Sequence, residues 1–428
     1  TLRCNGCGVC RTQDPALRMC PFFRLAASEE ASPRSKANAV RAHLSGFLDE
    51  GEFSGEPMKQ LANLCFNCKQ CQLECPSNVD IPHLMIEAKA QYTAANGLRR
   101  SDWILSRAHS FGVLGCRLVP ISNWLLNNGW ARWVMERLIG IARERRLPRF
   151  AGRTFLRSAA RDYSRRTGPL PKGAAVYFVD HFANFHDPQV GWSLIRLLER
   201  IGIPVHVPGE QSASGLAMIS AGDLDAARNV ALQNIRTLGP LAREGHPIIC
   251  SEPAAVIALR DEYPRLVDHP DVGPIAEQVR EAGSFLTARL GDVEQNLTWG
   301  ALPYRAAYHT PCHTRAVSGS SPWLELLERV PQLSIEPLQL GCSGMAGSFG
   351  LTRENFQVSL AIGQSLVERM TQPDLQLGIT ECSSCRLQME QAAGTPTLHP
   401  LKLLALSLGL IPEVRLKLNS NTRKWVVS

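Results

Sequence analysis

The sequence lacks any long apolar run: no window reaches the roughly eighteen consecutive apolar residues that a transmembrane helix requires. It also lacks the apolar segment of a secretory signal peptide near its first residue, Thr1. We therefore expect no membrane-spanning helix and a cytoplasmic location, where thiols stay reduced. A chain that starts with Thr is compatible with a processed product or with the C-terminal part of a longer polypeptide.

Several catalytic and binding fingerprints are absent as well. The glycine-rich stretch GCSGMAGSFG at 341–350 does not have the G-x-G-x-x-G spacing of a dinucleotide-binding loop, and no hydrolytic triad is evident. The net charge is only +7, and no nucleic-acid recognition motif accompanies the arginine-rich stretch at 132–166. We therefore predict that this chain has no flavin site of its own and does not bind nucleic acid.

What the sequence does contain is cysteine, with 14 residues that are unevenly placed. Eight lie within the first 75 positions, in the runs RCNGCGVC…MCP and LCFNCKQCQLECP, and four more follow position 310. The second run has the C-x2-C-x2-C-x3-C-P spacing of bacterial ferredoxins, and the first run differs only in a longer gap before its fourth cysteine. Zinc sites present pairs of ligands rather than two triplets that are each followed by Cys-Pro. We therefore predict two 4Fe–4S clusters.

The spacing also predicts which cysteines share a cluster. Three cysteines at C-x2-C-x2-C converge on one cube, whereas the fourth cysteine of such a run ligates the other cube. The first cluster is then bound by Cys4, Cys7, Cys10 and Cys75, and the second by Cys65, Cys68, Cys71 and Cys20.

A third group of cysteines lies in the C-terminal part, at Cys312, Cys342, Cys382 and Cys385. All four follow predicted strands, and parallel α/β sheets bind ligands at the carboxyl ends of their strands. His309 and His313 flank Cys312 as further ligands or as residues that support the ligands. This group is compatible with a third iron–sulfur cluster, with a zinc ion, or with reduced cysteines that bind nothing.

The pattern of apolar segments predicts an α+β multidomain chain. Residues 1–98 form a mainly helical two-cluster ferredoxin domain, and residues 99–172 form a helical connector rich in Trp and Arg. Strands then alternate with helices twice, at 173–290 and at 300–410, as in two repeated α/β units with parallel sheets. The first unit has His181, SASG and EPAA where the second has its cysteines, so we expect that it has lost the ligands.

The connector contains Trp103, Trp124, Trp130 and Trp133 beside many arginines. Indole rings and arginine side chains are both amphipathic, so this segment is compatible with a membrane surface or with a partner subunit. Packing against the rest of the chain is an equally good explanation.

On these motifs the chain resembles the family that includes the C subunit of anaerobic glycerol-3-phosphate dehydrogenase, the glycolate oxidase iron–sulfur subunit and the D subunit of heterodisulfide reductase. The segment RCNGCGVCR…MCPFFRLAASEEASPRSKANAVR also resembles D-2-hydroxy-acid dehydrogenases in which a flavin domain precedes it. The resemblance identifies both α/β units as CCG-type repeats. It departs from the family at Ser343, where a second adjacent cysteine is the rule, which argues against a five-cysteine cluster and against disulfide reduction.

The resemblance implies an iron–sulfur subunit or domain of a flavin-dependent dehydrogenase. FAD on an upstream domain or partner chain would oxidise a 2-hydroxy acid such as glycolate or D-lactate, or glycerol 3-phosphate. Electrons would then pass through this chain to a quinone or another carrier, with peripheral attachment to the inner face of the cell membrane. The alternative hypothesis is an iron–sulfur redox sensor or a scaffold with structural zinc in the C-terminal site.

Overall fold

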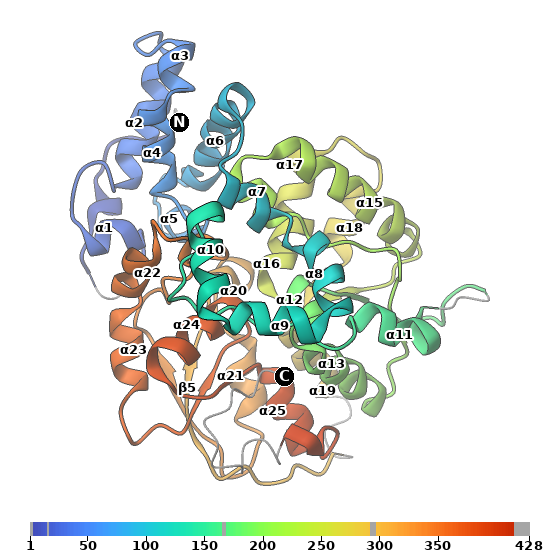
Figure 1. The fold of residues 1–428 in the computed structure, drawn as a ribbon. Coiled ribbons are helices and arrows are strands. Elements are labelled where there is room, and N and C mark those ends of the chain that lie inside the picture. Colours follow the sequence, from blue (N-terminus) through green and yellow to red (C-terminus); the bar gives the residue numbers. More distant parts are fainter. Residues whose placement is uncertain (1–2, 15–16, 165–167, 292–296, 415–428) are drawn as a thin grey trace.

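The computed structural model describes residues 3–14, 17–164, 168–291 and 297–414 (Figure 1). The N-terminal helices lie against the C-terminal part of the chain, and the middle part lies beside both. Within these ranges, no helix has the length and apolar character needed to cross a membrane.

The N-terminal domain is almost entirely helical and holds both cysteine runs in its loops. Its longest helix, α6 (Ile81–Asn96), begins at Asp80, whose carboxylate accepts from the backbone N–H of His83, and ends at Gly97 with φ 76°. Apolar residues of α2 (Pro33–Leu44) and α4 (Glu56–Asn63) pack on α6. The shorter helices are η1 (Val9–Arg11), α1 (Pro21–Leu25), α3 (Glu50–Phe53) and α5 (Gln70–Leu73).

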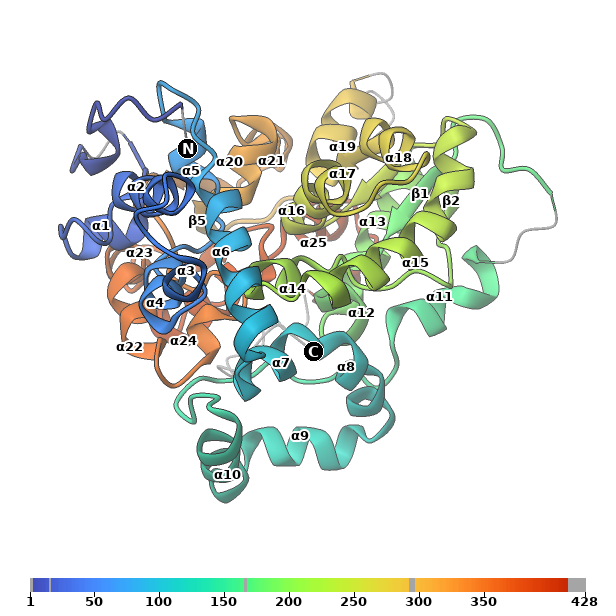
Figure 2. The ribbon, with the colours of Figure 1, turned by 90° about the horizontal axis from the view of Figure 1, so that it is seen from above.

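The connector forms a row of helices along one side of the molecule (Figure 2). It is fixed to the middle part by close packing, because a Cβ at Gly112 would lie 2.7 Å from the ring of Phe185. The backbone of Ile141 also forms a bridge to Thr352 in the C-terminal part. The helices are α7 (Arg100–Ser106), α8 (Ala108–Arg117), α9 (Val119–Asn127), α10 (Gly129–Ile139) and α11 (Phe155–Tyr163).

Two small parallel sheets follow, each with four strands. The first has the order β2-β1-β3-β4 and the second the order β6-β5-β7-β8, so the first strand of each part occupies an inner position. The strands are β1 (Ala175–Phe178), β2 (Val205–His206), β3 (Ile248–Cys250), β4 (Val279–Glu281), β5 (Arg305–His309), β6 (Ser334–Leu338), β7 (Leu377–Ile379) and β8 (Thr397–Leu398).

Helices cover both sheets and join them through one apolar core. Tyr177 of the first sheet and Tyr308 of the second belong to the same buried cluster, together with α13 and α25. The helices around the first sheet are α12 (His181–Phe185), α13 (Pro188–Arg200), α14 (Leu216–Ala221), α15 (Leu224–Arg243), α16 (Pro253–Ile257), η2 (Ala258–Glu262), α17 (Tyr263–Leu266), α18 (Val272–Gln278) and α19 (Ala282–Leu290). Those around the second are α20 (Cys312–Ser318), α21 (Pro322–Leu327), η4 (Phe349–Leu351), α22 (Phe356–Ile362), α23 (Gln364–Met370), α24 (Ser383–Ala393) and α25 (Pro400–Ser407).

One helix differs from its prediction. The sequence ENFQVSLAIGQSLVERM predicts a continuous helix, but the structure has two, α22 and α23, which meet at Gly363. A Cβ at Gly363 would lie 2.3 Å from the carbonyl oxygen of Ser343, so the break lets the loop that carries Cys342 approach the helix backbone.

Candidate metal centres

The first cysteine run lines a cavity. Cys4, Cys7, Cys10 and Cys75 all line it, together with Cys71 of the second run. The donor set is almost purely thiol, as iron–sulfur clusters demand. Cys7 is exposed, so this cavity lies at the surface of the protein.

A second cavity is lined by Cys20, Cys65, Cys68 and Cys71. It is more enclosed, since three of these four cysteines are buried. Burial raises the pKa of the Cys71 thiol well above its usual value, and the neighbouring thiols of Cys65 and Cys20 raise it further. The Cys71 thiol therefore interacts most strongly with the thiols of the second group, although it borders both cavities.

The backbone wraps both cavities in the same way. In the first run the residues before and after the middle cysteine are Gly6 and Gly8, with φ values of 76° and 77°. In the second run the equivalent residues are Asn67 and Lys69, with φ values of 57° and 63°. A left-handed conformation costs energy in a residue such as lysine, so its recurrence at matched positions indicates that the tight loop is required.

The segments that carry Cys20 and Cys75 are held together by Glu74. Its carboxylate accepts from the backbone N–H of Arg18 at 3.0 Å and from that of Met19 at 2.5 Å. The residue before Cys75 is thus bonded to the residue before Cys20, and each fourth cysteine lines the cavity of the opposite run. Crossed ligands, in which the fourth cysteine of each run binds the cluster of the other run, require this arrangement.

The C-terminal cysteines also lie together. Burial raises the pKa of the Cys312 thiol, and the thiols of Cys342 and Cys382 raise it further. The hydroxyl of Ser343 donates to Sγ of Cys385 at 3.2 Å, which holds the two loops side by side. In the described part of the chain no three His, Cys, Asp or Glu side chains meet at the spacing of a single-ion site.

The two flanking histidines have different surroundings. His309 is buried, burial lowers its pKa to about 3, and its Nδ1 has no hydrogen-bond partner within the described ranges. Nε2 of His313 donates to the carbonyl of Asn67 at 2.9 Å. His313 therefore contacts the second cysteine run rather than the C-terminal thiols.

The C-terminal cysteines lie directly against the second cavity. Gln70, inside the second cysteine run, donates through Nε2 to the carbonyl of Cys312 at 2.9 Å. Burial raises the pKa of Cys68 well above its usual value, and the next largest cause is the thiol of Cys312. Gln70 and Cys312 are 242 positions apart in the chain, so the sequence carries no signal of their contact.

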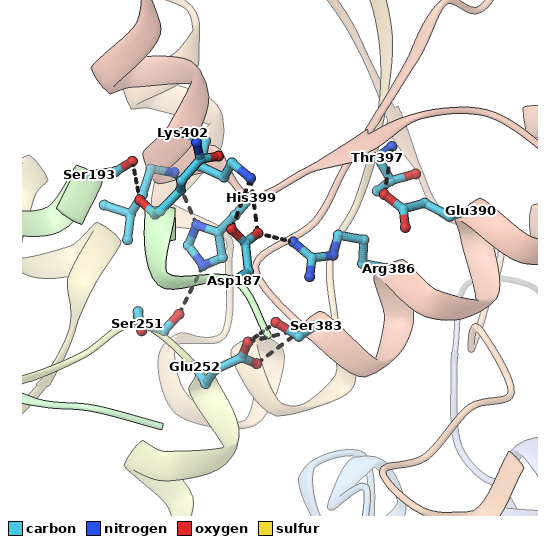
Figure 3. Close-up of polar contacts among 12 residues, drawn as sticks. Asp187, Ser193, Ser251, Glu252, Ser383, Arg386, Glu390, Thr397, His399 and Lys402 are labelled. Atoms are coloured by element: carbon cyan, nitrogen blue, oxygen red, sulfur yellow. Dashed lines mark hydrogen bonds and ion pairs between the residues drawn. The ribbon is translucent and has the colours of Figure 1, made fainter. Parts of the chain in front are cut away.

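The first sheet faces this site with a carboxyl group. Ile249 pairs with Tyr177 in the first sheet, as Ile379 pairs with Tyr308 in the second. Glu252 and Cys382 each lie three positions after these isoleucines, so they occupy corresponding positions in the two sheets. Its carboxylate accepts from the backbone N–H of Ser383 at 3.2 Å and from the Ser383 hydroxyl (Figure 3). A residue predicted only as part of a degenerate loop thus holds the loop of Cys382 and Cys385 in place.

The other sequence candidates of the first sheet do not gather thiols. Nε2 of His181 lies 3.2 Å from Nε2 of His186, in a part-buried pair beside the connector. Cys250 is fully buried on β3, where it packs as a small apolar residue. Cys116 is also buried, and its thiol donates to the carbonyl of Phe185.

Family models match two parts of the chain. A 4Fe-4S dicluster domain matches residues 1–79, and a Cysteine-rich domain of the CCG type matches residues 306–390. The two cysteine-bearing regions predicted from spacing are therefore confirmed as domains of these types.

Similar whole proteins include members of the predicted families. The C subunit of anaerobic glycerol-3-phosphate dehydrogenase from Escherichia coli (strain K12) is 29% identical over 95% of this chain and 98% of its own length. D-2-hydroxyglutarate dehydrogenase of the same organism is 24% identical over 94% of this chain, which spans only 43% of that protein. The B subunit of fumarate reductase (CoM/CoB) from Methanothermobacter marburgensis is 23% identical over 94% of this chain and 71% of its own length. The resemblance stated from the motifs is confirmed.

Proposed function

Because a 4Fe-4S dicluster domain and a Cysteine-rich domain lie in one chain, we propose that this protein is the iron–sulfur electron-transfer component of a flavin-dependent dehydrogenase. One observation carries the proposal: the three groups of cysteines lie next to one another, from the exposed Cys7 in the first group to the buried Cys385 in the third. When bound, iron–sulfur clusters supply redox centres whose potentials depend on charge, hydrogen bonding and exposure.

The cavities support the predicted ligand sets. Cys4, Cys7, Cys10 and Cys75 would hold the first cluster, and Cys20, Cys65, Cys68 and Cys71 the second. Cys312, Cys342, Cys382 and Cys385 would hold a third centre, for which an iron–sulfur cluster suits four soft ligands beside another cluster; zinc is the alternative. His309 would border this third centre.

The matched strand orders support the interpretation of 173–290 and 300–410 as two CCG-type units, of which the first is degenerate. Residues 1–98 and 99–172 would be the ferredoxin domain and the connector. In this arrangement the first unit contributes Glu252 in place of a ligand, and its role is to support the site of the second.

The partner would carry FAD, either on a separate chain or on a preceding domain. The 43% coverage of D-2-hydroxyglutarate dehydrogenase supports the second possibility, and the 98% coverage of the glycerol-3-phosphate dehydrogenase relative supports the first. The substrate would be a 2-hydroxy acid or glycerol 3-phosphate, and the electrons would leave for a quinone or another carrier.

Metal analysis tests this proposal. Anaerobically purified protein should contain about twelve irons and as many acid-labile sulfides per chain if all three thiol groups hold 4Fe–4S clusters, and about eight irons if the third does not. Dithionite should reduce these centres, but a hydroxy acid should do so only after a flavoprotein dehydrogenase is added. Oxidation of a hydroxy acid by the chain alone, or the absence of labile sulfide, would refute the proposal.

We also propose that the connector binds the surface of an anionic membrane. Ten of the sixteen large apolar side chains exposed in the described part of the chain lie between positions 103 and 138, and Trp124 and Trp130 are 60% and 73% exposed. Exposed arginines follow closely, at 117, 137, 143, 146, 149 and 153, whereas Arg165 and Arg166 lie outside the described residues. Apolar insertion and attraction to anionic lipid act together on such a surface.

Replacing Ile121, Trp124 and Trp130 together by Ser should reduce binding to phosphatidylserine-containing vesicles at least tenfold. Full burial of one such side chain contributes about 1.5–3 kcal/mol, so the loss of three exceeds a tenfold effect even if insertion is partial. Co-sedimentation measures the change. Phe47→Ser is the matched control, because Phe47 is 84% exposed but belongs to the ferredoxin domain. Equal loss in both variants would contradict a connector-specific membrane surface.

A further inference from the structure

Arg18 lies where the three thiol groups meet. It precedes Cys20 by two residues, and its backbone N–H donates to the carboxylate of Glu74, the residue before Cys75. Its side chain crosses to the C-terminal part, where Nη1 donates at 2.8 Å to the carbonyl of Thr310, two residues before Cys312. The guanidinium therefore projects from the ferredoxin domain toward the C-terminal thiols.

The positive charge of Arg18 has no carboxylate counterion. No Asp or Glu lies within ion-pair distance of its guanidinium in residues 3–14, 17–164, 168–291 and 297–414, and the nearby Glu74 instead pairs with Arg315 at 3.3 Å. Arginine keeps its proton at any physiological pH, so this charge is permanent. An uncompensated cation in a half-buried position acts strongly on charges that develop nearby.

The C-terminal thiols experience this charge. The Arg18 guanidinium lies within electrostatic reach of the thiols of both Cys342 and Cys312. The cation that acts on Cys20 is instead Lys36, although Cys20 is only two residues from Arg18 in the chain.

We propose that Arg18 is a positioning residue for electron transfer, which stabilises the reduced form of the centre held by Cys312, Cys342, Cys382 and Cys385. The inference rests on the proposed function and extends it. Each electron that this centre receives adds one negative charge, and a fixed cation at its edge lowers the free energy of the added charge. Because Arg18 belongs to the ferredoxin domain but acts on the C-terminal site, it favours movement of the electron from the second cluster to the third centre.

Replacing Arg18 by Gln tests the proposal, with Arg18→Lys as the charge-conserving variant. Gln keeps a polar N–H donor without the charge, and R18K, which is also unable to reproduce the guanidinium geometry, separates loss of charge from loss of the contact. In an anaerobic redox titration followed by electron paramagnetic resonance, R18Q should shift the reduction equilibrium of the C-terminal centre at least tenfold toward the oxidised form. For a one-electron couple this is a potential about 59 mV lower. R18K should restore most of the shift, and the cluster at Cys4, Cys7 and Cys10 should not respond.

Arg34→Gln is the spatial control. Arg34 lies beside Cys10 and pairs with Glu29 at 2.9 Å, so its removal should leave the C-terminal centre unchanged. Equal potentials in R18Q and wild type, or equal shifts in R18Q and R18K, would overturn the role of the Arg18 charge. A wild-type iron content of about eight would also overturn it while the ferredoxin function remained, whereas absence of all iron would refute the proposed function itself.

Discussion

Replacing Cys75 by Ser should remove about four irons per chain, and they should come from the site of the distant Cys4, Cys7 and Cys10 rather than from the run to which Cys75 belongs. The reason is the crossing of the chain at Glu74. Cys75 lines the first cavity with Cys4, Cys7 and Cys10, whereas Cys20 lines the second with Cys65 and Cys68. A serine oxygen is a poor substitute for a thiolate as an iron ligand, so we expect loss of the whole cluster.

A double variant distinguishes crossed from uncrossed ligands. If Cys4 and Cys75 serve one cluster, C4S/C75S should lose no more iron than either single variant, because the same cluster is already absent. If Cys75 serves the cluster of its own run, the double variant should lose about eight irons. Iron and labile sulfide per chain measure the difference, and C20S/C75S, which should lose both clusters under either arrangement, is the reference for complete loss.

Cys116→Ser is the matched control for these variants. Cys116 is as buried as Cys20, Cys68 and Cys71, but its thiol donates to the carbonyl of Phe185, which a serine hydroxyl can also do. Its iron content should equal that of the wild type. Additive loss in C4S/C75S would contradict the crossed arrangement.

Local spacing was sufficient to predict the types of the two cysteine-bearing domains, and many elements also have a local signal. The helix at Ile81 begins at Asp80 and ends at Gly97 because capping is a local property, and β1, β3, β5, β6 and β7 lie within apolar segments of the sequence. The outer strands β4 and β8 have no such signal. They have three and two residues, too few to show any periodicity, and only pairing with β3 and β7 makes them strands.

The contacts between sites could not be predicted, because they join residues that are far apart in the sequence. Gln70 reaches Cys312, and Arg18 reaches Thr310 across 292 positions. Glu252 was recognised only as a residue that stands where the second unit has CSSC; its bond to Ser383 depends on how the two sheets pack. Patterns within a segment predict the ligands. The residues that hold those ligands in place or interact with them electrostatically are evident only in the tertiary structure.

The packing of the two sheets includes a buried charge cluster that joins them (Figure 3). Asp187 at the start of α13 accepts from Arg386 of α24 at 2.7 Å and from Lys402 of α25 at 2.9 Å, and all three side chains are at most 1% exposed. Nε and Nη2 of Arg386 have no further partner in the described part of the chain. The negative charge of Asp187 therefore compensates the positive charges of two buried cations, Arg386 and Lys402.

Replacing Asp187 by Asn should lower the free energy of unfolding by about 3–5 kcal/mol, because it leaves Arg386 and Lys402 charged and unpaired in the interior. Urea unfolding of the cluster-loaded protein, followed by circular dichroism under anaerobic conditions, measures the loss. Asp225→Asn is the control, since the ion pair of Asp225 with Arg228 is exposed and contributes at most about 1 kcal/mol. The variant D187L/R386M/K402M, which removes all three charges, should recover most of the stability.

The same residue predicts an acid-dependent loss of stability. Burial alone would raise the pKa of Asp187, but Lys402 and Arg386 outweigh burial and lower it to about 2, from 3.8 for a free aspartate. Because its folded pKa is depressed, Asp187 contributes its full stabilisation above pH 3.8, and this contribution is lost as the pH falls toward 2. Between these values the stability of the wild type should therefore fall more steeply with decreasing pH than that of D187N. Parallel pH profiles for the two proteins would show that Asp187 is not the charge that holds the two sheets together.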